Sequence, residues 1–170
     1  YKINHVLMKN ITEIASSFLG DLVAQNKEGK KNVVVYDRGR NLSINKGARY
    51  HQTREGGSIH TDNVNVSSRW KYMILSCLAE GQVGGETILV SAKNVYEKLK
   101  KNFKQANKIL QKKFIWEKRG VAKSFYTAPI LKINKNGEPE FRYLRPYLES
   151  AHIKKKKPLS DKQLYALDVL

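Results

Sequence analysis

The strongest constraint on the fold is the repeated alternation of short β-type segments with turns. Residues 70–78 form a mostly apolar run whose length and flanks predict a buried strand. A turn follows over residues 81–85, and residues 87–90 are again rich in β-branched side chains. A parallel α/β sheet would alternate helix and strand more regularly, so the pattern favours a β-sandwich or jelly roll.

Helices are expected among these strands. Periodic apolar residues predict a helix over about residues 6–25, and Ser91 and Ser160 are suitable N-caps for two more. Asn136-Gly137 predicts a tight hairpin turn. The expected strands are residues 33–36, 58–61, 70–78, 87–90, 113–118, 124–127, 130–133 and 140–144, and the expected helices are 6–25, 91–99, 102–111 and 160–170. The expected class is therefore mainly β with inserted helices (α+β).

Length and composition limit the function classes. The 170 residues suit one domain, and 41% apolar with 28% charged residues excludes a disordered polyampholyte. No apolar run approaches the roughly 18–20 residues that span a bilayer, and no leader-like segment opens the chain. Cys77 is the only cysteine, which excludes an internal disulfide and a multi-cysteine metal site. A cytoplasmic setting is expected.

The net charge of +17 comes from 32 Lys and Arg residues against 15 Asp and Glu. Such an excess indicates a nucleic-acid or acidic-partner surface. The other interpretation is a lysine-rich solvated surface, because the lysines are scattered and no aromatic residues alternate with them as a base-stacking platform requires. We expect the solvated surface and no nucleic-acid partner.

His60-Thr61-Asp62 is the first candidate for chemistry. In a strand the side chains at i and i+2 point to the same face, so His60 and Asp62 can take adjacent positions on one metal. Two histidines and one carboxylate form the facial triad of non-haem Fe(II) oxygenases, of which this motif supplies two members. By itself the motif is weak, since a histidine near an acidic residue occurs often by chance.

Gly84-Gly85-Glu86-Thr87 is the second candidate. The glycines permit a tight reversal, and the Thr87 hydroxyl can donate a hydrogen bond to a carboxylate. Alone, this motif is more often a structural glycine turn.

The ordered combination is more specific than either motif. His60-x-Asp62, the apolar run 70–78, the Gly-Gly-Glu-Thr turn and the Val95-Tyr96-Glu97-Lys98-Leu99 helix resemble the taurine dioxygenase family. The later Arg142-Tyr143-Leu144-Arg145-Pro146-Tyr147 is similar to its relatives too, and the resemblance spans roughly residues 50–170. These are non-haem Fe(II)/2-oxoglutarate oxygenases, including clavaminate-synthase-like enzymes, and the resemblance implies a double-stranded β-helix.

The resemblance implies a role for each matching residue. His60 and Asp62 would bind Fe(II), and Thr87 would contact 2-oxoglutarate, with O2 as the second cosubstrate. In related halogenases a small residue replaces the carboxylate so that chloride can reach iron. Asp62 therefore argues for hydroxylation, desaturation or another oxidation, and against halogenation.

One departure concerns the third ligand. The family uses a distal histidine on iron and an arginine on 2-oxoglutarate, both well downstream of the glycine turn. His152 precedes the last expected helix and is interpreted as a loop, surface or supporting residue; His5 and His51 precede the motif. We expect residues 1–170 to be a single oxygenase domain and a fragment without the C-terminal part that carries these two residues.

Other polar residues are weaker candidates for substrate binding: Asn63, Asn65, Tyr50, His51, Arg142 and Arg145. For the two arginines a structural salt bridge is the alternative. The expected substrate is a small amino-acid-like or natural-product molecule, an expectation that rests on family analogy. Two other functions stay open: a basic nucleic-acid-binding module and a catalytically inactive jelly-roll scaffold. The oligomeric state is unknown.

Overall fold

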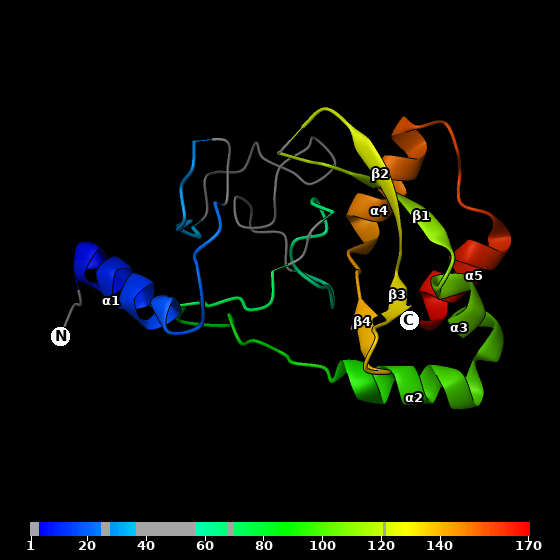
Figure 1. The fold of residues 1–170 in the computed structure, drawn as a ribbon, viewed down its shortest axis with the longest axis horizontal. Helices are drawn as coiled ribbons and strands as arrows, with labels where there is room; N and C mark the ends of the chain where they lie inside the picture. The colour runs from blue at the N-terminus through cyan, green and yellow to red at the C-terminus, as the bar shows by residue number, and fades with distance from the viewer. Residues whose placement is uncertain (1–3, 25–27, 37–56, 68–69, 121) are drawn as a thin grey trace. The chain divides into compact units, whose positions relative to one another are not determined.

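The computed structural model describes residues 4–24, 28–36, 57–67, 70–120 and 122–170 (Figure 1). The chain divides into two compact units. Unit 1 consists of Tyr1–Val35 and Ser68–Thr87, and unit 2 consists of Tyr36–Ser67 and Ile88–Leu170. Each unit is described here by itself.

Unit 1 contains one helix, α1 (His5–Ser17). It begins where Asn4 Oδ1 accepts a hydrogen bond from the Val6 amide at 2.9 Å, which satisfies one of the free N–H groups of the first turn. Within the unit, Thr12 Oγ1 lies 2.7 Å from Ser76 Oγ. Large apolar side chains of α1 are exposed, and Phe18, just beyond it, has 85% of its surface accessible.

Unit 2 holds the other helices and all the strands that the described residues form. The elements are α2 (Ala92–Asn102), α3 (Lys104–Leu110), β1 (Lys113–Glu117), β2 (Phe125–Pro129), β3 (Leu131–Ile133), β4 (Pro139–Phe141), α4 (Arg145–Lys154) and α5 (Asp161–Val169). β1 pairs with β2 and β3 with β4, both antiparallel. α3 packs against α5, α4 against β1, and α2 against α3 and β4 (Figure 1).

Local sequence explains where several elements begin and turn. Ser91 Oγ accepts from the Asn94 amide at the start of α2, and Ser160 forms a capping box with Gln163 at the start of α5. Between β3 and β4, Asn134 Oδ1 accepts from two turn amides, and Gly137 has φ 79°, a left-handed conformation that glycine tolerates best.

The hydrophobic core lies in unit 2, between the hairpins and the helices. Phe114 and Leu148 are fully buried, and Trp116 is 1% exposed, with its Nε1 donating to the Ala128 carbonyl at 3.1 Å. The indole N–H is therefore satisfied inside the core. The core also contains Val64, Leu99, Ala106, Ile109, Leu110, Ile130, Leu131, Phe141, Leu144, Tyr147, Ala166 and Leu167.

Four of the expected strands are wrong. Residues 33–36, 58–61, 70–78 and 87–90 form no strand, and most of the run 70–78 is exposed. Apolar and β-branched composition favours extended backbone, but a strand also needs a hydrogen-bonded neighbour. No such neighbour pairs with these runs in the described part of the chain.

The helices expected over residues 91–99, 102–111 and 160–170 are confirmed in position, whereas α1 ends earlier than expected, at Ser17. α4 was not expected. Its second residue is Pro146, a residue type that usually interrupts a helix. Proline is tolerated in the first turn because the N–H group that it lacks would have no hydrogen-bond partner within the helix there.

The α+β class is confirmed, but the expected predominance of β structure is wrong for the described residues, because the helices there contain more residues than the strands. The strands that the structure describes form two separate two-stranded sheets and no closed barrel, so the double-stranded β-helix remains a proposal. None of the described helices is both long and apolar enough to cross a bilayer.

Candidate metal centre

The candidate ligands lie in a stretch of irregular backbone, residues 57–67, which we call the site segment. Its conformation depends on contacts with distant parts of unit 2. The Thr61 amide donates to the Tyr143 carbonyl at 2.7 Å, and the Tyr143 amide donates to Thr61 Oγ1 at 2.9 Å. Further along, Val64 is 3% exposed and belongs to the core. Thr61, the middle residue of the His-x-Asp motif, is thus attached to Tyr143, just before α4.

His60 and Asp62 face each other. His60 Nε2 lies 3.7 Å from Asp62 Oδ1, and their side chains are 29% and 49% exposed. The expected strand is absent, yet the two side chains still meet. The His60 ring lies against Gly57, where an added Cβ would stand only 3.0 Å from the imidazole Cε1.

The ring orientation of His60 suits a metal ligand. Its Nδ1 lies 2.7 Å from the Ser58 carbonyl oxygen. Because a carbonyl can only accept, Nδ1 carries the proton, and in the neutral ring the Nε2 lone pair is directed away from Ser58. A backbone carbonyl on the distal nitrogen is the usual support of a metal-bound histidine.

The donor set fits part of an octahedral Fe(II) site. Neighbouring donors on such an ion, each about 2.1 Å from it, stand about 3 Å apart. The observed separation of 3.7 Å between His60 Nε2 and Asp62 Oδ1 is slightly wider than this. An imidazole with a carboxylate is the donor pair of the facial triad.

A third ligand is not found in the part of the chain that the structure describes, where no group of three or more His, Cys, Asp and Glu side chains could hold a metal. His152 is buried in α4, not on a loop or the surface. Its Nε2 accepts from the Ile115 amide at 3.0 Å, and its Nδ1 donates to the Lys157 carbonyl at 2.8 Å. The two ring nitrogens connect α4 to β1 and to the backbone of Lys157, so His152 has a structural role. Tyr50 and His51 lie outside the described residues.

Thr87 is the last residue of unit 1, where it is exposed. Before it, Gly84 and Gly85 have φ of 75° and 96°. These left-handed conformations are the reversal expected from the Gly-Gly pair. The contact of Thr87 with 2-oxoglutarate remains a proposal.

Asn63 and Asn65 differ in their surroundings. Asn63 has φ 62°, and its buried Nδ2 has no hydrogen-bond partner among the residues described. A buried amide donor without a partner is costly, and it marks a place where a ligand or water can accept a hydrogen bond. The Nδ2 of Asn65 already donates to the Arg119 carbonyl at 2.8 Å.

The two arginines offered for substrate binding have protein partners. Arg142 is 6% exposed and donates to the carbonyls of Val66 and Ser67. Arg145 pairs with Glu149 and Asp168, each at 2.7 Å. Hydrogen bonds to these two carboxylates raise the pKa of the Arg145 guanidinium further above its ordinary value.

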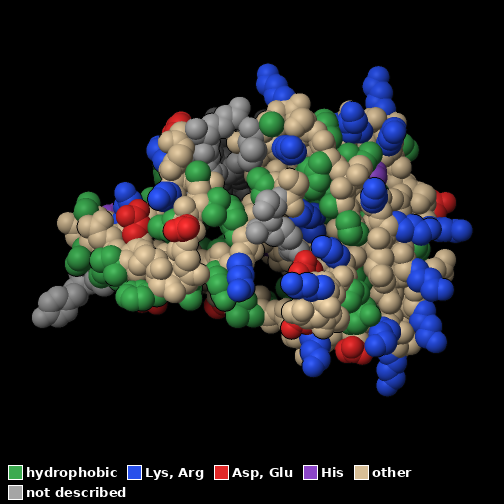
Figure 2. Space-filling view, in the orientation of Figure 1, with side chains coloured by type: hydrophobic (Ala, Val, Ile, Leu, Met, Phe, Trp, Pro, Cys, Tyr) green, Lys and Arg blue, Asp and Glu red, His purple; other side chains and the backbone are tan. Residues whose placement is uncertain are grey.

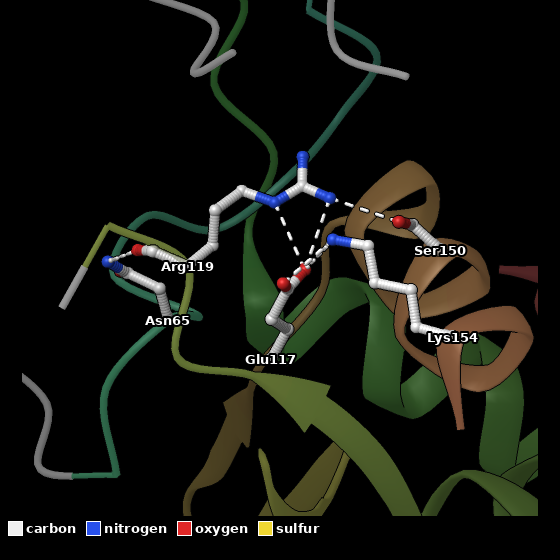
Figure 3. Close-up of polar contacts among 5 residues, drawn as sticks. All are labelled: Asn65, Glu117, Arg119, Ser150 and Lys154. Carbon is white, nitrogen blue, oxygen red and sulfur yellow. Dashed lines mark hydrogen bonds and ion pairs between the residues drawn. The ribbon is translucent and has the colours of Figure 1, made fainter. Parts of the chain in front are cut away.

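A polar network that was not expected from the sequence lies beside the site segment (Figure 3). Glu117 accepts from Lys154 at 2.7 Å and from Arg119 at 3.4 Å, and Arg119 also donates to Ser150 Oγ. Arg119 is buried and lies 4.1 Å from the centre of the Tyr147 ring. The spacing of Glu117 and Arg119 at i and i+2 was the available signal, since such side chains share one face of an extended chain.

The basic surface is clearest in unit 2. Figure 2 shows many Lys and Arg side chains projecting from it. Exposed lysines follow α2 and α3, and others lie at the end of α4: Lys93, Lys98, Lys100, Lys101, Lys104 and Lys108, then Lys154 to Lys157.

Comparison with known proteins identifies one family. The family model of the taurine catabolism dioxygenase TauD, TfdA family matches residues 12–169. No curated protein and no solved structure matches the chain. Since the match covers most of the chain, the protein belongs to the TauD/TfdA family, whose members are 2-oxoglutarate-dependent dioxygenases.

Proposed function

We propose that the protein is an Fe(II)/2-oxoglutarate-dependent dioxygenase in which His60 and Asp62 supply two protein ligands to the iron. The observation that carries this proposal is the approach of His60 Nε2 to Asp62 Oδ1, at 3.7 Å, with His60 Nδ1 held by a backbone carbonyl. The family membership supports dioxygenase chemistry in general.

Each residue has a definite task in this proposal. The bound iron with 2-oxoglutarate and O2 supplies the oxidising power, and the protein positions the substrate and limits side reactions. His60 offers a neutral nitrogen to the iron, and Asp62 offers an anionic oxygen. The Thr87 hydroxyl donates a hydrogen bond to a carboxylate of 2-oxoglutarate. The unpartnered Asn63 amide is a donor for substrate.

The proposed reaction is oxidation of an unactivated C–H bond, by hydroxylation in the first instance, in a small amino-acid-like or natural-product substrate. We propose the double-stranded β-helix of the family as the fold and residues 1–170 as part of one oxygenase domain. A reducing cytoplasmic setting suits the free, exposed Cys77.

The test is the coupled conversion of 2-oxoglutarate to succinate and carbon dioxide by the protein that carries the remaining ligand. His60→Ala and Asp62→Ala should each abolish this turnover, because each removes an iron ligand. Lys98→Ala, which removes an exposed lysine from α2, is a control that should keep it. Turnover that survives in either ligand variant would show that the assignment is wrong.

A second candidate, a basic nucleic-acid-binding module, is motivated by the net charge of +17 and the exposed lysines of α2, α3 and α4. A third, a catalytically inactive scaffold, is motivated by the missing third ligand among the described residues. Metal-dependent 2-oxoglutarate turnover that is lost on substitution of His60 would exclude the inactive scaffold.

A further inference from the structure

We propose that Arg142 and Tyr126 are positioning residues for the His60–Asp62 pair, because they fix the backbone that leads away from Asp62. The inference rests on the function proposed above, since it concerns the same site. It gives Arg142 a different task from the contact with a substrate carboxylate expected from its sequence position.

The first step is the set of acceptors around Arg142. Its Nη1 donates to the Val66 carbonyl at 2.6 Å and to Tyr126 Oη at 2.5 Å, and its Nη2 donates to the Ser67 carbonyl at 3.1 Å. The guanidinium carbon also lies 5.3 Å from the centre of the Tyr126 ring. Two of these three acceptors belong to the site segment.

The second step is Tyr126, on β2. Its hydroxyl accepts from Arg142 and donates its own proton to the Val64 carbonyl at 2.6 Å. One chain of hydrogen bonds therefore runs from Arg142 through Tyr126 to Val64, while Arg142 also binds two carbonyls directly. Together they fix three backbone carbonyls within a few residues of Asp62.

The third step is the burial of the charge. Arg142 is 6% exposed, and a buried guanidinium is costly unless its charge is compensated, ordinarily by a carboxylate. Its acceptors here are neutral oxygens, and no acidic side chain in the described residues forms an ion pair with it. Charge-assisted hydrogen bonds are stronger than neutral ones, so this arrangement holds the site segment more firmly than a neutral donor would.

The fourth step is the need for such support. His60 and Asp62 lie on irregular backbone, and Asp62 is largely exposed. A ligand pair held in place before the metal arrives loses less conformational freedom on binding. Substituting a residue that orients metal ligands commonly lowers metal affinity by about 10–100-fold.

The test compares two tyrosine substitutions in the protein that carries the remaining ligand, well below its melting temperature. Tyr126→Phe removes only the hydroxyl that joins Arg142 to Val64. Tyr96→Phe, on α2, is the matched control, because Tyr96 is half-buried against the same core. Arg142→Lys keeps the charge but not the three-way contact. The two measurements are Co(II) affinity by titration and amide hydrogen exchange at Thr61 and Asp62 without metal.

Tyr126→Phe should weaken Co(II) binding about 10-fold and accelerate exchange at Thr61. Arg142→Lys should change both in the same direction, and Tyr96→Phe should change neither. If Arg142→Lys does not fold, Tyr126→Phe decides. Wild-type Co(II) affinity and wild-type exchange in Tyr126→Phe would overturn the inference. If the wild type binds Co(II) no better than Asp62→Ala, the proposed metal site is wrong, and the exchange measurement alone decides the positioning role.

Discussion

Thr61 and Tyr143 are 82 positions apart in the sequence, and the backbone amide of each donates a hydrogen bond to the other residue. The Thr61 amide is bound by the Tyr143 carbonyl, and the Tyr143 amide by Thr61 Oγ1. Within the His60-Thr61-Asp62 motif, Thr61 is the residue that is not a candidate metal ligand. Its contact with Tyr143 attaches the motif to the residues just before α4.

The first prediction concerns this contact. Thr61→Val keeps the shape of the side chain but removes the acceptor of the Tyr143 amide. A partly buried donor left without a partner costs about 1 kcal/mol, the lower end of the range for buried groups, so the free energy of unfolding should fall by about that amount in urea denaturation. Thr61→Ser keeps the hydroxyl and should stay close to the wild type. Equal loss in both variants would mean that packing of the methyl group, and not the hydrogen bond, matters.

The second prediction concerns pH. The pKa of Tyr143 is raised above its ordinary 10.0, first by burial and then by Glu149 and Asp168, against the lowering effect of Arg145. Below about pH 10 the phenol is protonated in both the folded and the unfolded state, so it adds no pH dependence. Above that pH the unfolded chain releases the proton first. The free energy of unfolding should therefore fall as the pH rises from 10 through the folded-state pKa.

Tyr143→Phe should make that alkaline fall shallower, measured by urea denaturation at a series of pH values. Tyr165→Phe removes an exposed phenol and is the matched control. The same alkaline slope in Tyr143→Phe and the wild type would contradict the role of half-buried Tyr143.

The third prediction concerns α5. Ser160→Ala removes the capping box with Gln163 and should cost about 1 kcal/mol. For a chain of this size that is a fall in melting temperature of about 2–4 °C by calorimetry. Ser160→Asp retains an acceptor for the Gln163 amide and should recover most of the loss. No difference between alanine and aspartate would show that α5 is held by Ala166 and Leu167 alone.

The fourth prediction concerns the reaction type. If Asp62 binds the iron, no position is left for a halide, so the active protein supplied with chloride should give an oxygenated or dehydrogenated product. Asp62→Gly should lose most of the activity, because one protein ligand is gone. Product analysis by mass spectrometry is the measurement. A chlorinated product from the wild type would overturn the role of Asp62 as a ligand.

The fifth prediction concerns the lysines. If they form only a solvated surface, binding to random-sequence DNA at about 0.15 M salt should be weak, and affinity should fall steeply as salt is added. Fluorescence anisotropy across a salt series is the measurement. Tight, salt-resistant or sequence-selective binding would favour the nucleic-acid function over the enzyme.

Elements with local signals could be predicted from the sequence. The serine caps at Ser91 and Ser160 and the Asn136-Gly137 turn depend on hydrogen bonds and backbone angles within a few residues, and all three lie where expected. Residues 70–78 were misassigned because a strand depends on a partner that sequence composition does not supply. α4 was not expected because Pro146, a residue type that usually interrupts a helix, lies in its first turn.

The candidate site was predictable only in part. The spacing of His60 and Asp62 at i and i+2 predicted that their side chains lie on the same face of the backbone, and the two side chains do face each other. They meet on irregular backbone and not on a strand, and the Ser58 carbonyl holds the imidazole. No short-range pattern could predict that Tyr126 and Arg142 contact the site segment, since these contacts join residues 60 or more positions apart.

The long reach of the contacts to residues 57–67 has a consequence for the order of folding. The hairpins and helices of residues 88–170 form from neighbours in the sequence, whereas the site segment is held across separations of 54 to 82 residues. Closing loops of that length carries an entropic cost that is recovered only once the docking surface exists. We therefore expect the site segment to dock late during folding and to detach early under mild denaturation, so that the proposed metal site is lost before the hairpins and helices unfold.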